Sequence, residues 1–142
     1  RAAISAAADA GDRDVPVGAV VFDANGRELA RAANAREALG DPTAHAEILA
    51  LRRAAAVVGD GWRLEGCTLA VTLEPCTMCA GAISFARIRR LYYGAADPKG
   101  GAVDSGVRFF AQPTCHHVPE VYSAVGETEA ATLLKAFFKV RR

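Results

Sequence analysis

The stretch CTLAVTLEPCTMCAGAISFARIRRLYYGA (residues 67–95) decides the fold class. It opens with the apolar run CTLAVTL (67–73), which predicts a buried strand. Pro75 then suits the first turn of a helix that we expect to run to about Ala86. RRLYYGA (89–95) predicts a second strand. A strand, a helix and a strand in succession imply that the two strands pair in parallel inside a mixed sheet covered by helices. The predicted fold class is α/β.

The residues before this stretch predict a hairpin and a helix. VPVGAVVFD (15–23) and ELARAAN (28–34) flank an Asn-Gly turn, which is a strong signal for a β-hairpin. DPTAHAEILALRRAAAVV (41–58) has apolar residues at helical spacing. Asp41 can cap this helix, and Pro42 suits its first turn, so we expect the helix to begin there.

The two ends of the chain predict further elements. Residues 1–11 are rich in alanine and favour a helix. The segment 97–113 holds several glycines and prolines, which predict a loop with at most one short turn. Residues 117–125 predict a last strand at an edge of the sheet, because Pro119 cannot donate to a ladder. Residues 127–142 predict a closing amphipathic helix.

Length and composition limit the class of protein. A chain of 142 residues fits one domain, which we place at 1–142, and 51% of its residues are hydrophobic. No apolar run approaches the roughly 18 residues that span a bilayer, so we expect a soluble, cytoplasmic protein without membrane contact. The first residue is Arg1 rather than Met, and we therefore expect the natural chain to begin further upstream.

The net charge does not by itself indicate a nucleic-acid-binding protein. Lys and Arg number 17 and Asp and Glu 16, which gives a formal charge of +1. Six positive charges are concentrated in ARIRR (86–90) and FFKVRR (137–142). Such clusters are also typical of solvated helix ends, where cations complement the helix dipole.

Cys76 and Cys79 form a C-x-x-C pair directly after Pro75. The four cysteines of the chain are too few and too unevenly spaced for a disulfide framework. A pair at this spacing can be a redox switch, half of a structural zinc site or half of a catalytic one.

His45 and Glu47, in the motif HAE, offer the other half of a catalytic site. The histidine and the cysteine pair each stand at the beginning of a predicted helix, where a helix N-terminus lowers the pKa of a thiol. Zn²⁺ bound by two thiolates and one imidazole keeps a fourth position for water. Glu47 can then take a proton from zinc-bound water and return it to a substrate. H-x-E followed by P-C-x-x-C is the signature of zinc-dependent nucleobase deaminases.

Two other uses of the cysteines explain less of the sequence. A redox pair gives no reason for the H-x-E motif 30 residues earlier, and a Cys₄ zinc site with Cys67 and Cys115 leaves that motif without a role. Cys67 opens a predicted strand and is interpreted as a small buried hydrophobic residue. The roles of Cys115, His116 and His117 stay open, although the histidines fit surface or substrate-side positions better than zinc ligation.

With these motifs the chain resembles the bacterial tRNA-specific adenosine deaminases of the cytidine-deaminase-like superfamily. The resemblance covers essentially the whole chain and is densest in VPVGAV, DPTAHAEI, TLEPCTMCAGAI, ARIRRLYYGA and LLKAFFKVRR. It implies a three-layer α/β/α fold with a mixed five-stranded sheet. It also implies one Zn²⁺ per chain, a homodimer, and a tRNA anticodon stem-loop as substrate. The implied reaction is the hydrolytic deamination of adenosine to inosine at the wobble position, by zinc-bound hydroxide with a glutamate as proton shuttle.

The same resemblance implies roles for individual residues. It makes His45, Cys76 and Cys79 the zinc ligands and Glu47 the proton shuttle. Substrate contacts are implied for a second group: Asn34 and Ala46 at the base, Asp97 and Lys99 in a flanking loop, and Phe137, Phe138, Arg141 and Arg142 on the terminal helix.

Two rival functions make different demands on the chain. A zinc-dependent deaminase of a free base or nucleoside, such as guanine, cytosine or cytidine, has no need of the basic terminal helix. A non-catalytic, zinc-stabilised RNA-binding module has no use for Glu47 as a proton shuttle.

Overall fold

The computed structural model describes residues 1–141, and side chains through Lys139. Its strands and helices follow the predicted order with one addition, the short helix α2. The elements are α1 (Ala2–Ala7), β1 (Gly18–Phe22), β2 (Glu28–Ala33), α2 (Arg36–Leu39), α3 (Ala46–Val58), β3 (Thr68–Leu73), α4 (Thr77–Phe85), β4 (Arg90–Ala95), the 3₁₀ helix η1 (Phe109–Ala111), β5 (Glu120–Tyr122) and α5 (Glu127–Arg141).

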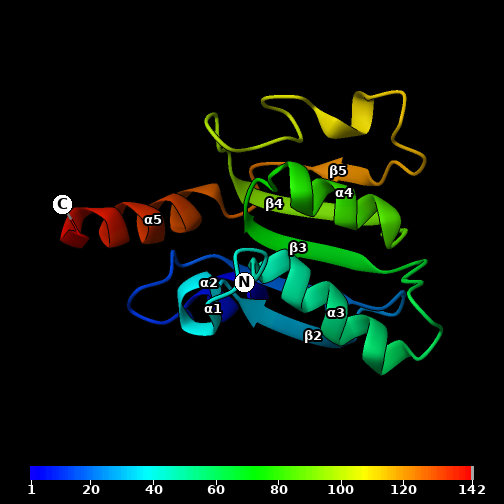
Figure 1. The fold of residues 1–142 in the computed structure, drawn as a ribbon, viewed down its shortest axis with the longest axis horizontal. Coiled ribbons are helices and arrows are strands. Elements are labelled where there is room, and N and C mark those ends of the chain that lie inside the picture. The colour runs from blue at the N-terminus through cyan, green and yellow to red at the C-terminus, as the bar shows by residue number, and fades with distance from the viewer. Residues whose placement is uncertain (142) are drawn as a thin grey trace.

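The five strands form one mixed sheet in the order β2-β1-β3-β4-β5 (Figure 1). β1 pairs antiparallel with β2, as the predicted hairpin requires, and it also pairs antiparallel with β3. β3 and β4 pair in parallel, with Leu69 opposite Leu91, which confirms the prediction from residues 67–95. β5 pairs in parallel with β4 at the edge of the sheet. The fold is the predicted three-layer α/β/α arrangement with a five-stranded sheet.

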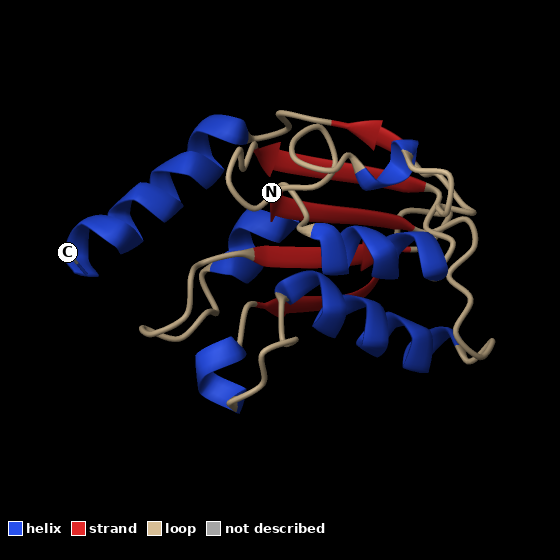
Figure 2. Ribbon diagram, turned by 45° about the horizontal axis from the view of Figure 1, so that its top comes forward, coloured by secondary structure: helices blue, strands red, loops and turns tan. Residues whose placement is uncertain are grey.

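Helices cover both faces of the sheet because the strands alternate their apolar side chains. Val21 of β1 belongs to the main core under α3 and α4, whereas the neighbouring Val20 packs with α1 on the other face. Figure 2 shows α3 and α4 lying along one face of the sheet. The approach of α1 requires a glycine at position 18, since a Cβ there would lie 2.1 Å from the carbonyl oxygen of Ala3.

The predicted start of the helix over 41–58 is wrong by several residues. α3 begins at Ala46, and His45 is its N-cap residue with extended backbone, φ −71° and ψ 151°. Asp41 instead closes a local turn, in which its Oδ1 accepts hydrogen bonds from the backbone N–H and the hydroxyl of Thr43, both at 2.8 Å. The backbone N–H of Ala35 also donates to the carbonyl of Ala44, which holds the turn against the end of β2.

α4, which follows β3, and α5, which follows β5, lie in different positions relative to the sheet. α4 begins at Thr77, two residues after Pro75, and packs on the sheet. α5 contacts β4 and β3 near its beginning and then extends past the sheet at the end where α3 and α4 begin (Figure 1). Within the part of the chain that the structure describes, no helix combines the length and the apolarity that crossing a bilayer requires.

Candidate metal centre and substrate pocket

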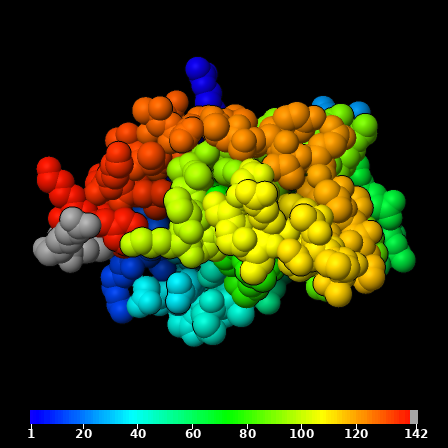
Figure 3. Space-filling view, turned by 90° about the horizontal axis from the view of Figure 1, so that it is seen from above, coloured from blue at the N-terminus to red at the C-terminus, as the bar shows by residue number. Residues whose placement is uncertain are grey.

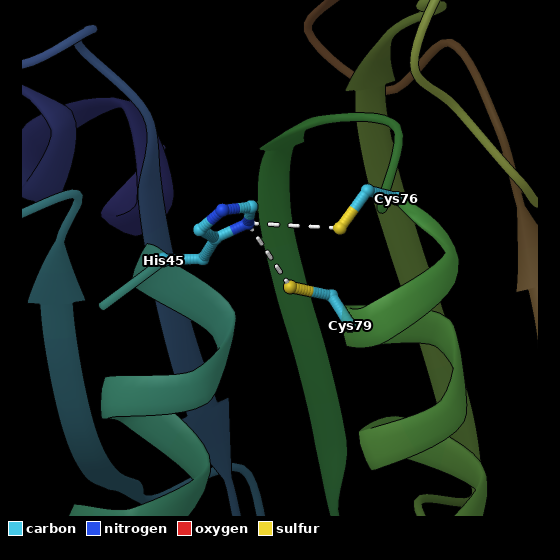
Figure 4. A group of neighbouring side chains, drawn as sticks. All are labelled: His45, Cys76 and Cys79. Atoms are coloured by element: carbon cyan, nitrogen blue, oxygen red, sulfur yellow. Dashed lines mark hydrogen bonds between the residues drawn. The ribbon is translucent and has the colours of Figure 1, made fainter. Parts of the chain in front are cut away.

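The N-termini of α3 and α4 place His45, Cys76 and Cys79 together. His45 and Cys76 are the N-cap residues of the two helices, and neither side chain makes a capping hydrogen bond to its own helix. Their side chains are therefore free to point into the space between the helices. Cys79 follows in the first turn of α4, on the same side as Cys76. Figure 4 shows the imidazole and both sulfurs turned toward one another from opposite helices.

The distances in this cluster suit a tetrahedral zinc ion. Nδ1 of His45 lies 3.6 Å from Sγ of Cys76 and 3.5 Å from Sγ of Cys79. The three ligand atoms lie within 4.8 Å of one another. Zinc with bonds of about 2.3 Å to sulfur and 2.0–2.1 Å to nitrogen separates tetrahedral S and N ligands by about 3.5 Å. Among the described residues, this is the one cluster of His, Cys, Asp and Glu ligand atoms with metal-binding geometry.

The electrostatics of the cluster also favour a bound cation. Hydrogen bonding by the Cys79 thiol and the neighbouring His45 lower the pKa of Cys76 to about 4. The same pairing with Cys76, together with burial, raises the pKa of Cys79. Hydrogen bonding to Cys76 raises the pKa of His45. One thiolate is thus favoured and a second is disfavoured, because two would repel each other in a partly buried site. A divalent cation removes this repulsion, so the donor set fits Zn²⁺.

Glu47 lies beside the cluster without belonging to it. Its side chain, in the first turn of α3, is buried and only 5% exposed. The pKa of this carboxyl is raised to about 7, chiefly by burial and also by the nearby Cys76, while a backbone hydrogen bond and His45 act in the opposite direction. A carboxyl that titrates near neutral pH is suited to accepting and releasing protons.

A pocket of about 260 Å³, here called the metal pocket, opens beside these residues. Asn34, Ala46, Glu47 and Asp97 are among the residues that line it, together with His45 and Cys76. The amide of Asn34 is held in place, since its Nδ2 donates to the carbonyl of Val15 at 3.3 Å and its Oδ1 accepts from the backbone N–H of Arg36 at 3.4 Å. Four of the sequence-predicted site residues outside the metal cluster therefore meet at one pocket.

A larger cavity of about 920 Å³ adjoins this pocket and is lined by two more of the predicted substrate-binding residues. The two cavities share Val15, Leu73 and Asp97, whereas Lys99 and Phe138 line only the larger one. α5 forms one wall of it and the segment after β4 another. Figure 3 shows that segment, yellow-green to yellow, beside α5, orange to red. The side chain of Arg141 and all of Arg142 lie outside the described residues, and Phe137 does not line this cavity.

The structure adds residues to the site that the sequence analysis missed. Arg36 lines the metal pocket, and Lys135 and Lys139 line the larger cavity. The spacing of 135, 138 and 139 at i, i+3 and i+4 places these side chains on one face of a helix, so the pattern was available in the sequence. Glu74 was also missed, because its role depends on residues that follow it by more than 20 positions.

The remaining cysteines and one histidine lie elsewhere. Cys67 is buried in the main core, where burial raises the pKa of its thiol, in keeping with a small hydrophobic residue. Cys115 contacts the hydroxyl of Ser84 at 3.5 Å, and the same hydroxyl donates to the carbonyl of His117 at 2.7 Å. A ring nitrogen of His117 contacts the carbonyl of Ile88 at 2.7 Å. These contacts fasten the segment before β5 to the C-terminal end of α4.

Comparison with known protein families places the zinc motifs in a family. The model of the cytidine and deoxycytidylate deaminase zinc-binding region matches residues 1–95. The tRNA-specific adenosine deaminase of Agrobacterium fabrum is 60% identical over 141 residues, which cover 99% of this chain and 91% of the relative. The match therefore extends over both zinc motifs and the terminal helix.

Comparison with solved structures agrees. A structure from studies of A-to-I editing by tRNA:A34 deaminases at the wobble position superposes with a TM-score of 0.89 and 61% identity, covering 93% of this chain and 95% of that one. A guanine deaminase from Nitrosomonas europaea superposes with a TM-score of 0.72 and 27% identity, covering 96% of this chain and 77% of that one. The fold is thus shared with a small-molecule deaminase, but the similarity to the tRNA enzyme is much greater.

Proposed function

This chain belongs to the tRNA-specific adenosine deaminase family, and from that premise we propose that it converts adenosine to inosine at the wobble position of a tRNA anticodon by hydrolytic deamination. The observation that carries the proposal is the cluster of His45, Cys76 and Cys79 with the carboxyl of Glu47 beside it. A hydrolytic deaminase needs a metal site and a proton-transferring group at one pocket, and here both line the same 260 Å³ pocket.

We propose that His45, Cys76 and Cys79 hold one Zn²⁺. When bound, zinc lowers the pKa of a coordinated water to about 7 and so supplies a nucleophile at neutral pH. Glu47, which lines the same pocket, would accept the proton that this water loses. The carboxyl would deliver this proton to N1 of the adenine ring. It would then take the second proton from the hydroxyl group added at C6 and pass it to the departing amine, which leaves as ammonia. Burial supports this role because it brings the pKa of Glu47 to about 7, close to the operating pH.

Asn34 and Ala46 are proposed to hold the base edge. Asn34 has its amide oriented by the carbonyl of Val15 and the N–H of Arg36, so its position does not depend on the substrate. Ala46 is fully buried at the first position of α3, where the first backbone N–H groups of a helix have no intrahelical acceptor. The amide of Asn34 offers a fixed acceptor and a fixed donor, and Ala46 offers a free backbone N–H. Together these groups suit the hydrogen-bonding edge of a purine.

The larger cavity supports a polynucleotide substrate rather than a free base. Lys99, Lys135 and Lys139 line it with Phe138, which is 49% exposed. Cations and an exposed ring in one groove fit phosphates and unstacked bases of a single-stranded loop. Since this cavity adjoins the metal pocket, a target base in that pocket leaves its flanking nucleotides in the cavity. Arg141 and Arg142 extend the same positive segment in the sequence.

Mass spectrometry of a tRNA anticodon stem-loop incubated with the zinc-loaded protein tests this function. A mass increase of about one unit at the wobble adenosine is expected, because an amine is replaced by an oxygen. Guanine, cytosine, adenosine and cytidine serve as parallel substrates. Turnover of free guanine with an unchanged stem-loop would assign the protein instead to the small-molecule deaminases that share its fold. No turnover of any substrate by a zinc-loaded protein would leave the binding-module alternative.

We further propose that the protein is a cytoplasmic homodimer. An apolar groove between α3 and α4 supports self-association: Phe85 is 70% exposed and Trp62 51%, and both line this groove with Leu51 and Ala55. Exposed apolar surface of this kind is typical of an interaction site. The cytoplasm is proposed because the metal site requires free thiols and the substrate is tRNA.

A further inference from the structure

The carboxylate of Glu74, between β3 and Pro75, is 2% exposed and accepts five hydrogen bonds. Oε1 accepts from the backbone N–H of Asp97 and from the hydroxyl of Ser105, both at 3.0 Å. Oε2 accepts from the backbone N–H groups of Val103, Asp104 and Ser105 at 3.0, 2.9 and 2.9 Å. All the donors belong to residues 97–105, here called the mouth loop.

Two contacts show how closely the mouth loop is wound around the residues before Cys76. The backbone N–H of Ala102 donates to the carbonyl of Pro75 at 2.9 Å. Gly101 passes so near that a Cβ at this position would lie 2.5 Å from Cδ of Glu74. The loop is therefore attached directly to the segment that presents a proposed metal ligand.

The mouth loop also carries residues of both cavities. Asp97 lines the metal pocket and the larger cavity, and Gly100 and Lys99 line one each. Oδ1 of Asp97 accepts hydrogen bonds from the backbone N–H groups of Lys99 and Gly100 at 3.2 and 3.0 Å. The position of Asp97 thus sets the positions of the next residues, and Glu74 holds the backbone of Asp97.

We propose that Glu74 is a positioning residue for the nucleic-acid substrate: its carboxylate fixes the mouth loop so that Asp97 and Lys99 stand where the nucleotides flanking the target base bind. This inference rests on the proposed function. Glu74 would thus contribute to substrate affinity, although it takes no part in metal binding or in proton transfer.

Glu74→Gln separates this role from packing, because glutamine has nearly the same shape but only one acceptor oxygen. The three backbone N–H groups that converge on Oε2 can only donate hydrogen bonds. We therefore expect the single amide oxygen of the glutamine to occupy the Oε2 position. The amide NH₂ then faces the N–H of Asp97, while the Ser105 hydroxyl can turn to accept from it. The end of the mouth loop at Asp97 is expected to be released and the other end retained.

Hydrogen exchange and kinetics on the zinc-loaded variant test the proposal. The amide of Asp97 should lose protection by roughly tenfold or more, consistent with the loss of a hydrogen bond to a charged group. For the anticodon stem-loop, KM should rise roughly tenfold while kcat at saturation stays within about threefold, since the chemical groups are unmoved. Zinc content should stay at one per chain. Ser105→Ala, which removes one of the five bonds, should show a smaller rise in KM.

Ser84→Ala is the matched control, because it removes a buried hydrogen bond at the far end of α4. It should lower the melting temperature and leave KM unchanged. Loss of Asp97 protection in Glu74→Gln with unaltered KM would overturn the proposal, and so would a fall in kcat with loss of zinc. If Glu74→Gln does not fold, an unchanged KM in Ser105→Ala overturns it as well. The hydrogen-exchange measurement needs no substrate, so it tests the role of Glu74 in the mouth loop by itself. A wild-type enzyme that is inactive on the stem-loop would refute the proposed function, whatever the exchange result.

Discussion

Nδ1 of His45 lies 3.5 Å from Sγ of Cys79, although 34 residues separate them in the chain. The contact exists because α3 and α4 lie side by side on one face of the sheet and begin at the same end of it (Figure 4). Their caps and first turns, which carry no side-chain capping bonds, therefore face each other. The ligand atoms are already at zinc-binding separation in the folded protein, so the site requires little rearrangement to bind metal.

The first prediction concerns metal content. Because three protein ligands converge, the purified protein should hold about one zinc per chain, with two sulfurs, one nitrogen and one light, exchangeable ligand. X-ray absorption and metal analysis measure this. Removal of the metal with a chelator should lower the melting temperature, since binding stabilises the folded state. Four sulfur ligands, or full activity without metal, would contradict the proposed site.

The second prediction separates proton transfer from coordination. Glu47→Ala should keep its zinc and a near-native melting temperature, because Glu47 is not among the three proposed ligands. Its turnover should fall by at least roughly 10²–10⁴-fold, the usual effect of losing a general acid–base group. Cys79→Ala, the matched variant at a proposed ligand, should lose both metal and stability. If Glu47→Ala sheds its zinc, the role proposed for Glu47 is wrong.

The third prediction concerns the lysines of α5. Lys135→Ala with Lys139→Ala should weaken stem-loop binding and reduce the log–log salt slope by roughly 0.7 for each single-strand phosphate that the protein no longer neutralises. Binding titrations at several salt concentrations measure both effects. Zinc content should not change, because neither lysine lines the metal pocket. Removal of Arg27, just before β2, and Arg53, midway along α3, is the charge-matched control; neither residue lines the metal pocket or the larger cavity, so the slope should change much less.

A fourth prediction extends this test to Arg141 and Arg142. Neutralising both should weaken stem-loop binding and flatten its salt dependence, again by roughly 0.7 in slope for each phosphate left without its cation. Any activity on a free nucleoside should be nearly unaffected. A terminal helix whose cations only complement its dipole would instead show a small loss of stability and an unchanged salt slope.

A fifth prediction tests the dimer. Phe85→Glu places a charge in the apolar groove between α3 and α4, so it should shift the protein from dimer to monomer in light scattering at micromolar concentration. Folding should persist because the side chain is 70% exposed in the single chain. Val125→Glu, which charges an exposed apolar residue outside this groove, is the control and should leave the mass unchanged. A monomeric wild-type protein would refute the dimer.

The sequence alone determined the fold class and the chemistry of the zinc motifs. The parallel pair of β3 and β4 followed from the apolar runs around Pro75, because a helix between two buried strands forces a crossover. His45, Glu47, Cys76 and Cys79 could be selected by residue type and spacing, since few side chains bind zinc or transfer protons. These properties are local in the chain, and a local pattern is sufficient to indicate them.

Only the tertiary structure decided where each helix begins and how the pocket is held open. Asp41 and Pro42 have good capping chemistry, yet α3 begins at Ala46, because Asp41 accepts hydrogen bonds from Thr43 and the N–H of Ala35 bonds to the carbonyl of Ala44, which holds residues 41–44 in a turn. Glu74 reads in the sequence as one more acidic residue, and its five donors come from residues 97–105. The reason is the range of the interactions: propensity and spacing act over a few residues, whereas a buried carboxylate is stable only where the whole fold brings donors to it.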